Sequence, residues 1–89
     1  MNNKIALESL TMDLKRVAIG YHRNSLTMAN RFYEEALKRK NELDMSSLRP
    51  YIIRFINRID VLTNQENDAV ADEALLISTL LQNYTQKFL

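Results

Sequence analysis

The sequence predicts an all-α fold, in which residues 1–89 form a single-domain antiparallel four-helix bundle with up-down-up-down topology. Three observations predict it. The chain of 89 residues has one Gly and one Pro, which leaves little turn chemistry for a many-stranded β fold. Residues that favour helices, such as Ala, Leu, Lys and Glu, dominate. Apolar residues recur at steps of three and four in four successive segments, and the short connections between these segments favour antiparallel neighbours.

The first two helices are expected over residues 3–19 and 25–43. Apolar residues form one stripe in each, at Ile5, Leu7, Leu10, Leu14, Val17, Ala18 and Tyr21, and at Leu26, Ala29, Phe32, Tyr33, Ala36, Leu37 and Leu43. A break is expected within residues 20–25. Gly20 costs about 1 kcal/mol relative to Ala inside a helix, and Asn24 and Ser25 favour helix caps. A single helix that bends through this point is the alternative.

The third and fourth helices are expected over residues 48–62 and 67–87. Ser46 or Ser47 can cap the third helix, and Pro50 fits its first turn. The segment from Thr63 to Glu66 has the spacing of a capping box before the fourth helix, and Asn67 and Asp68 offer a second possible start. The apolar stripes of the two helices are Ile52, Phe55, Ile56, Ile59 and Leu62, and then Val70, Ala74, Ile77, Leu80, Leu81, Tyr84 and Phe88.

The charges are unevenly distributed along the chain, although the net charge is only +1. Residues 1–58 carry eleven Lys and Arg against six Asp and Glu, a net charge of +5. Residues 59–89 carry one Lys against five acids, a net charge of −4. Two interpretations follow: helix faces of opposite sign pack together within the bundle, or a basic surface faces an anionic partner or the inner surface of a membrane.

No residue pattern indicates catalysis, a cofactor or a metal site. The chain has no Cys, which excludes disulfides and cysteine-based zinc sites. His22 is the only histidine, and its neighbours lack the Lys and small residues of a phosphotransfer histidine. It also has no Glu at the offset that di-iron bundles use. We therefore expect a protein that is not an enzyme, that binds no small-molecule substrate and that acts by presenting a surface.

Two groups of residues are candidates for that surface. Arg49, Arg54 and Arg58 could contact phosphates, but the domain is not strongly basic and the helix after Thr63 begins with acids, so no nucleic-acid partner is expected. Tyr84 and Phe88 lie on the last turns of the fourth helix. They form either an exposed aromatic patch used for recognition or the closed end of the bundle.

The middle of the chain resembles the immunity proteins against pediocin-like (class IIa) bacteriocins, the enterocin A immunity group. The resemblance covers residues 37–82. It lies in Lys40-Asn41-Glu42-Leu43-Asp44, in Ser46-Ser47-Leu48, in Arg54-x-x-Asn57, in the Asn-containing break over residues 63–67 and in Glu73-Ala74-Leu75-Leu76-Ile77. That family forms small antiparallel four-helix bundles. Many of its members continue past the fourth helix with a tail that helps set bacteriocin specificity, and because this chain stops at Leu89 we expect that role to be shortened or absent.

The resemblance implies a bacteriocin immunity protein of a Gram-positive bacterium. Such a protein stays in the cytoplasm, where it can associate peripherally with the inner face of the membrane. It protects the cell by binding the sugar-phosphotransferase permease with its bound bacteriocin from the cytoplasmic side. No apolar run of the length of a membrane span and no signal peptide are evident in the sequence. On this interpretation the partner-binding residues are Arg49, Arg54, Arg58, Tyr84, Lys87 and Phe88. The alternative is a small helical adaptor or regulatory module that binds another protein.

Overall fold

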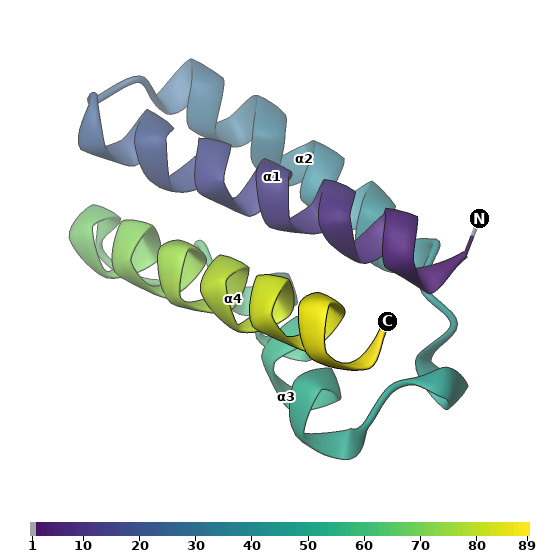
Figure 1. Ribbon diagram of the computed structural model, residues 1–89. Helices are drawn as coiled ribbons and strands as arrows, with labels where there is room; N and C mark the ends of the chain where they lie inside the picture. Colours follow the sequence, from purple (N-terminus) through teal and green to yellow (C-terminus); the bar gives the residue numbers. More distant parts are fainter. Residues whose placement is uncertain (1) are drawn as a thin grey trace.

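The computed structural model describes residues 2–89 and confirms the all-α four-helix architecture (Figure 1). The helices are α1 (Asn3–His22), α2 (Leu26–Asn41), α3 (Pro50–Arg58) and α4 (Asn67–Phe88). Two short 3-10 turns complete the chain, η1 (Met45–Ser47) before α3 and η2 (Ile59–Val61) after it. Figure 1 shows that α2 and α4 both run antiparallel to α1.

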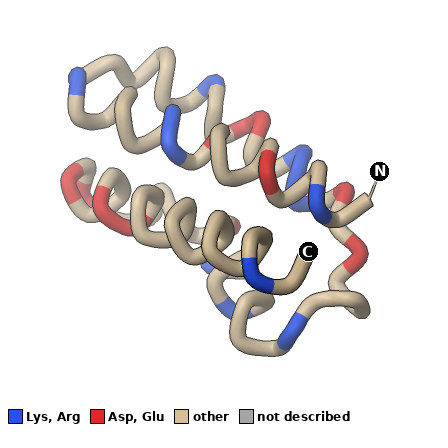
Figure 2. Tube along the Cα trace, in the orientation of Figure 1, with Lys and Arg blue, Asp and Glu red and all other residues tan. Residues whose placement is uncertain are grey.

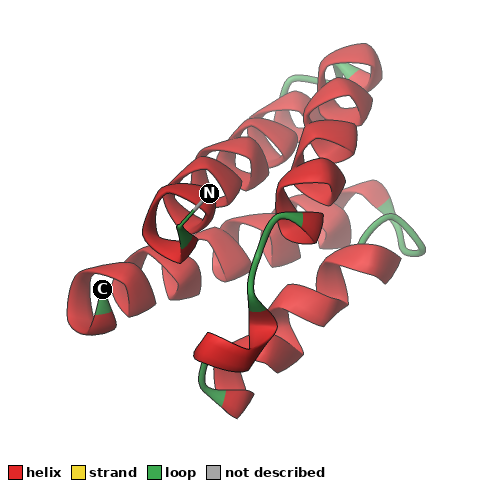
Figure 3. Ribbon diagram, turned by 90° about the vertical axis from the view of Figure 1, so that its right-hand side faces the viewer, coloured by secondary structure: helices red, strands yellow, loops and turns green. Residues whose placement is uncertain are grey.

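The helices do not contribute equally to the bundle. Helix α1 packs along both α2 and α4, whereas the short α3 packs chiefly on α4 and crosses it at an incline (Figures 1 and 3). The core lies between these helices and includes the residues Leu7, Leu10, Leu14, Val17, Ile52, Ile56, Ile59, Leu62, Val70, Ile77 and Leu81, all of which are fully buried. Two members of the predicted stripes are not part of this core, because Ile5 and Leu26 are about half exposed, at 51% and 49%.

The break between the first two helices is confirmed, but the prediction that Gly20 causes it was wrong. Helix α1 continues through Gly20 to His22, and the chain turns at Asn24, whose φ of 55° is in the left-handed region that Asn tolerates. Position 20 requires a residue without a side chain, because α1 and α2 approach each other closely at this point. A Cβ at Gly20 would lie 2.7 Å from the backbone nitrogen of Ala29 and 2.9 Å from its Cα and Cβ atoms.

The predicted ends of the other helices also needed correction. Helix α2 ends at Asn41 rather than at residue 43. Neither Ser46 nor Ser47 caps α3: both lie in η1, which Asp44 caps by accepting a hydrogen bond from the Ser46 backbone nitrogen at 3.1 Å. Arg49 precedes α3 without a side-chain cap, and Pro50 occupies the first turn as expected.

Helix α4 begins at Asn67 as predicted and ends at Phe88, one residue later than expected, whereas α3 differs from the prediction at both ends. Helix α3 is shorter because the chain tightens into η2 after Arg58. The Ile59 carbonyl accepts a hydrogen bond from the Tyr33 hydroxyl at 2.6 Å, in addition to one from the Leu62 backbone nitrogen at 3.3 Å, so the Tyr33 side chain ties this helix end to α2. The capping box from Thr63 does not form, because α4 begins after Glu66, which makes no side-chain cap.

Helix α1 buries one charged residue, Asp13, which is only 6% exposed. Its Oδ2 atom has no hydrogen-bond partner within residues 2–89, and its nearest cation, Arg16, is 3.8 Å from Oδ1. Burial raises the pKa of Asp13, and Arg39 and Arg16 offset this only in part. The carboxylate is therefore a cost to the fold at neutral pH.

Two ion pairs join the basic first part of the chain to its acidic last part. Lys40 contacts Asp60 at 3.0 Å, and Arg58 contacts Glu73 at 2.8 Å. Figure 2 shows that the acidic residues of α4 gather at its N-terminal end, where the helix dipole favours them. The self-complementary interpretation of the charge asymmetry therefore holds for these two pairs.

Candidate functional site

The start of α3 and the end of α4 meet at one end of the molecule, and four of the six predicted residues lie there. Arg49, Tyr84, Lys87 and Phe88 come together with Tyr51, a residue that the sequence analysis did not select. We call this group of five the aromatic corner. The up-down-up-down topology brings them together, because residue 49 begins one helix and residue 88 ends its antiparallel neighbour.

Tyr84 is the structural centre of the aromatic corner. It is 3% exposed, and its hydroxyl accepts a hydrogen bond from the Arg49 backbone nitrogen at 3.1 Å. A buried tyrosine hydroxyl needs such a partner, and here the bond fixes the entry into α3. The Tyr84 ring lies edge-on to Tyr51, with centroids 5.9 Å apart, and 4.9 Å from the Phe88 ring. Tyr84 therefore closes the end of the bundle and is not an exposed recognition residue.

The accessible part of the aromatic corner combines cations with aromatic rings. The Arg49 guanidinium lies over the Phe88 ring, 4.1 Å from its centroid, and the Lys87 ammonium is 5.3 Å from the same centroid. Tyr51 is 46% exposed and Phe88 is partly exposed. Neither cation forms a salt bridge with any residue that the structure describes. An Arg stacked on a ring beside an exposed Tyr has the composition of an energetically important protein–protein contact.

A shallow hollow borders the aromatic corner, where the chain passes from η1 into α3. It is lined by residues of this connection and of the last turn of α4: Ser46, Ser47, Leu48, Arg49, Pro50, Tyr84, Phe88 and Leu89. The two serine hydroxyls already donate to the Asp44 carboxylate, at 2.6 and 2.9 Å. These hydrogen bonds hold the pKa of Asp44 below its ordinary value. The hollow therefore has few free polar groups, which suits an apolar side chain of a partner better than a polar small molecule.

Arg58 does not join the other predicted residues. Its guanidinium makes two hydrogen bonds to the Glu73 carboxylate, at 2.8 and 2.9 Å, and Gln65 donates to the same carboxylate. The Arg58 hydrogen bonds are the main reason that the pKa of Glu73 lies below its ordinary value. Arg58 thus fastens α3 to α4 and has its charge neutralised, which corrects its assignment to a binding surface.

Arg54 is exposed and lies three residues after Tyr51, so the two share the outer side of α3. It forms no salt bridge within the described part of the chain. Arg54 therefore extends the positive charge of the aromatic corner along α3, although no contact joins it to the five residues.

Tyr51 could have been selected from the sequence. The apolar stripe of the third helix assigns Ile52, Ile56 and Ile59 to the core, so Tyr51 must point away from it. An outward aromatic residue two positions after Arg49 is the signal that was missed.

Residues 2–89 contain no group of three or more His, Asp and Glu side chains placed to hold a metal ion. None of the helices that the structure describes has both the length and the apolar character needed to cross a membrane. Comparisons with models of protein families, with curated proteins and with solved structures find no match for this chain.

Proposed function

We propose that this chain is an immunity protein against a pore-forming, pediocin-like bacteriocin and that it acts by binding rather than by catalysis. In this proposal it binds the sugar-phosphotransferase permease with its bound bacteriocin from the cytoplasmic side. The aromatic corner is the observation that carries the proposal. It provides a compact group of accessible rings and of cations without a salt bridge, in which Arg49 and Tyr51 belong to the part of the chain that resembles the family and Lys87 and Phe88 follow it on α4.

The chemistry of the aromatic corner indicates what kind of partner surface would fit it. Arg49 and Lys87 have no carboxylate partner in the described chain, so an acidic side chain or an anionic lipid headgroup beside the permease would complement them. Tyr51 and Phe88 offer apolar area with limited side-chain freedom. Buried Tyr84 keeps the start of α3 and the end of α4 at a fixed separation, so the surface exists before the partner arrives.

A protection assay tests the proposal. The chain is expressed in a bacteriocin-sensitive Gram-positive strain, which is then exposed to a panel of pediocin-like peptides. We expect the inhibitory concentration of one subset of peptides to rise clearly. The proposal would be refuted if the folded, expressed protein gave no protection against any peptide, and the helical-adaptor alternative would then be preferred.

Variants locate the activity on the molecule. The double variant Arg49→Glu with Lys87→Glu reverses the charge of the aromatic corner without touching a buried side chain, and we expect it to lose protection. Lys4→Glu with Arg23→Glu is the matched control, because it changes the net charge by the same amount at two exposed residues that form no salt bridge within residues 2–89 and lie outside the aromatic corner. Equal loss of protection by the control would show that overall charge matters and that the aromatic corner is not the contact surface. Circular dichroism would verify that each variant is folded.

A further inference from the structure

Helix α1 carries apolar residues on the side that faces away from the core. Ile5, Met12 and Ile19 are 51%, 46% and 39% exposed and are spaced seven residues apart. Seven residues complete almost two turns, so the three side chains form a line along the helix. We call this line the α1 ridge. It is about 21 Å long at 1.5 Å per residue. Residues 2–89 leave about half of each of these side chains exposed, so packing within one copy accounts for only part of their apolar surface.

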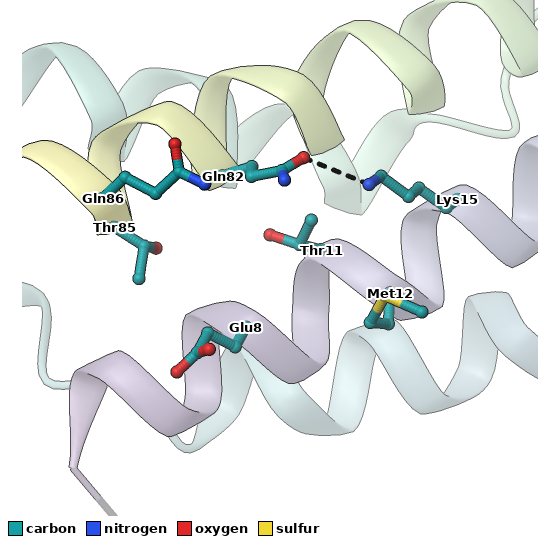
Figure 4. Close-up of a pocket in the computed structure, with 7 residues that line it drawn as sticks. All are labelled: Glu8, Thr11, Met12, Lys15, Gln82, Thr85 and Gln86. Atoms are coloured by element: carbon teal, nitrogen blue, oxygen red, sulfur yellow. Dashed lines mark hydrogen bonds between the residues drawn. The ribbon is translucent and has the colours of Figure 1, made fainter.

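A groove runs beside the α1 ridge, between α1 and α4 (Figure 4). Thr11 and Thr85 lie at its base and are 4% and 6% exposed. Each threonine hydroxyl donates to the carbonyl four residues earlier in its own helix, at 2.8 Å, so neither hydroxyl is free for a ligand. The other polar side chains of the groove are Glu8, Lys15, Gln82 and Gln86, and two of these, Lys15 and Gln82, bond each other. The groove can therefore accept an apolar side chain that has charged neighbours.

Charged residues on the flank of the α1 ridge follow the same seven-residue spacing. Glu8 and Lys15 both line the groove and carry opposite charges. Lys15 donates a hydrogen bond to the Gln82 side chain at 3.1 Å, as Figure 4 shows, whereas Glu8 has no salt bridge or side-chain hydrogen bond within residues 2–89. Next to Met12 the flank is therefore negative on the side towards the start of α1 and positive on the side towards its end, and the exposed cation Lys4 lies one turn before Glu8.

This pattern is self-complementary for an antiparallel pair of α1 helices related by a two-fold axis near Met12. Such an axis places Ile5 opposite Ile19 of the second copy, Met12 opposite Met12 of the second copy, and Glu8 opposite Lys15 of the second copy. The Ile5–Ile19 and Glu8–Lys15 pairs each occur twice, once on each side of the axis, and the Met12 pair lies on the axis, as an isologous interface requires. A parallel pairing would instead place Glu8 against Glu8 and Lys15 against Lys15, which repel.

We propose that the α1 ridge is the contact surface of a homodimer in which two copies pair through antiparallel α1 helices, with Met12 of each copy seated beside the groove of the other. The charges indicate that the occupant is a second copy, because the two-fold axis places Glu8 of each copy opposite Lys15 of the other. A contact about 21 Å long and about 10 Å wide is far smaller than the ~800 Å² per partner of a standard interface. The dimer is therefore weak and depends on protein concentration. It does not depend on the proposed function, because no residue of the aromatic corner lies on the ridge.

Analytical ultracentrifugation of the whole chain, from about 1 μM to about 1 mM, tests the proposal in the range where a weak interface dissociates. We expect the weight-average mass to rise towards twice the monomer mass. Met12→Glu places the glutamates of the two copies against each other at the two-fold axis, so it should abolish the rise in weight-average mass. Leu76→Glu is the matched control, because Leu76 is 54% exposed on α4 outside the ridge and groove, and it should associate like the unmodified protein.

A charge exchange tests the antiparallel arrangement. Glu8→Lys alone should weaken association at least several-fold at low salt, because it brings like charges together, and adding Lys15→Glu should restore it. A monomer at every concentration would overturn the proposal, as would a dimer unaffected by Met12→Glu or equally disrupted by Leu76→Glu. Failure of the double exchange to restore association would overturn the antiparallel pairing.

Discussion

Replacing Gly20 by Ala should destabilise the protein, although helix propensity alone predicts the opposite. Gly20 lies inside α1, where Ala is favoured over Gly by about 1 kcal/mol. The added Cβ would lie 2.7 to 2.9 Å from three atoms of Ala29, and two of these are backbone atoms that no rotamer change can move. Helix α2 would have to shift away from α1. Overpacking of this kind costs about 1–3 kcal/mol, and the backbone contacts place this site at the upper end.

The net expectation for Gly20→Ala is a loss of about 2 kcal/mol, once the gain in helix propensity is subtracted from the cost of the clash. A domain of this size would then melt about 8–16 °C lower. Urea unfolding followed by circular dichroism measures the change. Adding Ala29→Gly should not restore stability, because the Ala29 nitrogen and Cα atoms remain in place. An unfolding midpoint equal to or above that of the unmodified protein would refute the close approach of α1 and α2.

Two further predictions concern the core and the buried charge. Ile56 is fully buried, so Ile56→Ala should cost about 2–5 kcal/mol in urea unfolding, and a near-neutral result would mean that α3 is wrongly placed. Asp13 binds its proton more tightly in the folded state than in the unfolded state, so its contribution to stability falls as pH rises from about 3.8 through its raised pKa. Asp13→Asn should therefore stabilise the protein at neutral pH, and the gain should shrink as the pH falls towards 3.8; a gain that stayed constant with pH would contradict this reasoning.

The helices and their order could be predicted from the sequence because apolar periodicity depends on local spacing. Their ends were harder, because several residues compete to cap each one. Asp44, Ser46 and Ser47 all favour such a position, and the outcome is a 3-10 turn capped by Asp44 ahead of an uncapped α3. Gly20 was misinterpreted for a different reason. Its role is set by Ala29 on the neighbouring helix, a contact that no local rule contains.

The candidate site was only partly predictable, for a related reason. Placing Arg49 near Phe88 needs only the bundle topology, and the structure brings them together. To exclude Arg58 from the binding surface, one must know the register of α3 against α4. The charge of Arg58 is neutralised only because this register places Glu73 within hydrogen-bond distance. Apolar periodicity fixes which face of a helix is buried, but it does not fix how far one helix is displaced along another. Assignments that depend on a partner across an interface therefore require the structure.

The apolar residues on the outer face of α1 indicate contact with another molecule, because the other faces of the helix pack within the bundle. Gly20 and Asp13 lie towards α2 and the buried Thr11 lies towards α4, whereas Glu8, Met12 and Lys15 line the open groove. Only the outer face is free of packing constraints, and polar residues there would cost the monomer nothing. Substituting an exposed residue away from any contact usually changes stability by less than about 0.5 kcal/mol. Met12→Glu should therefore leave the unfolding free energy of the monomer within that limit while it abolishes association, because the apolar α1 ridge contributes to contact between copies and not to the fold of one copy.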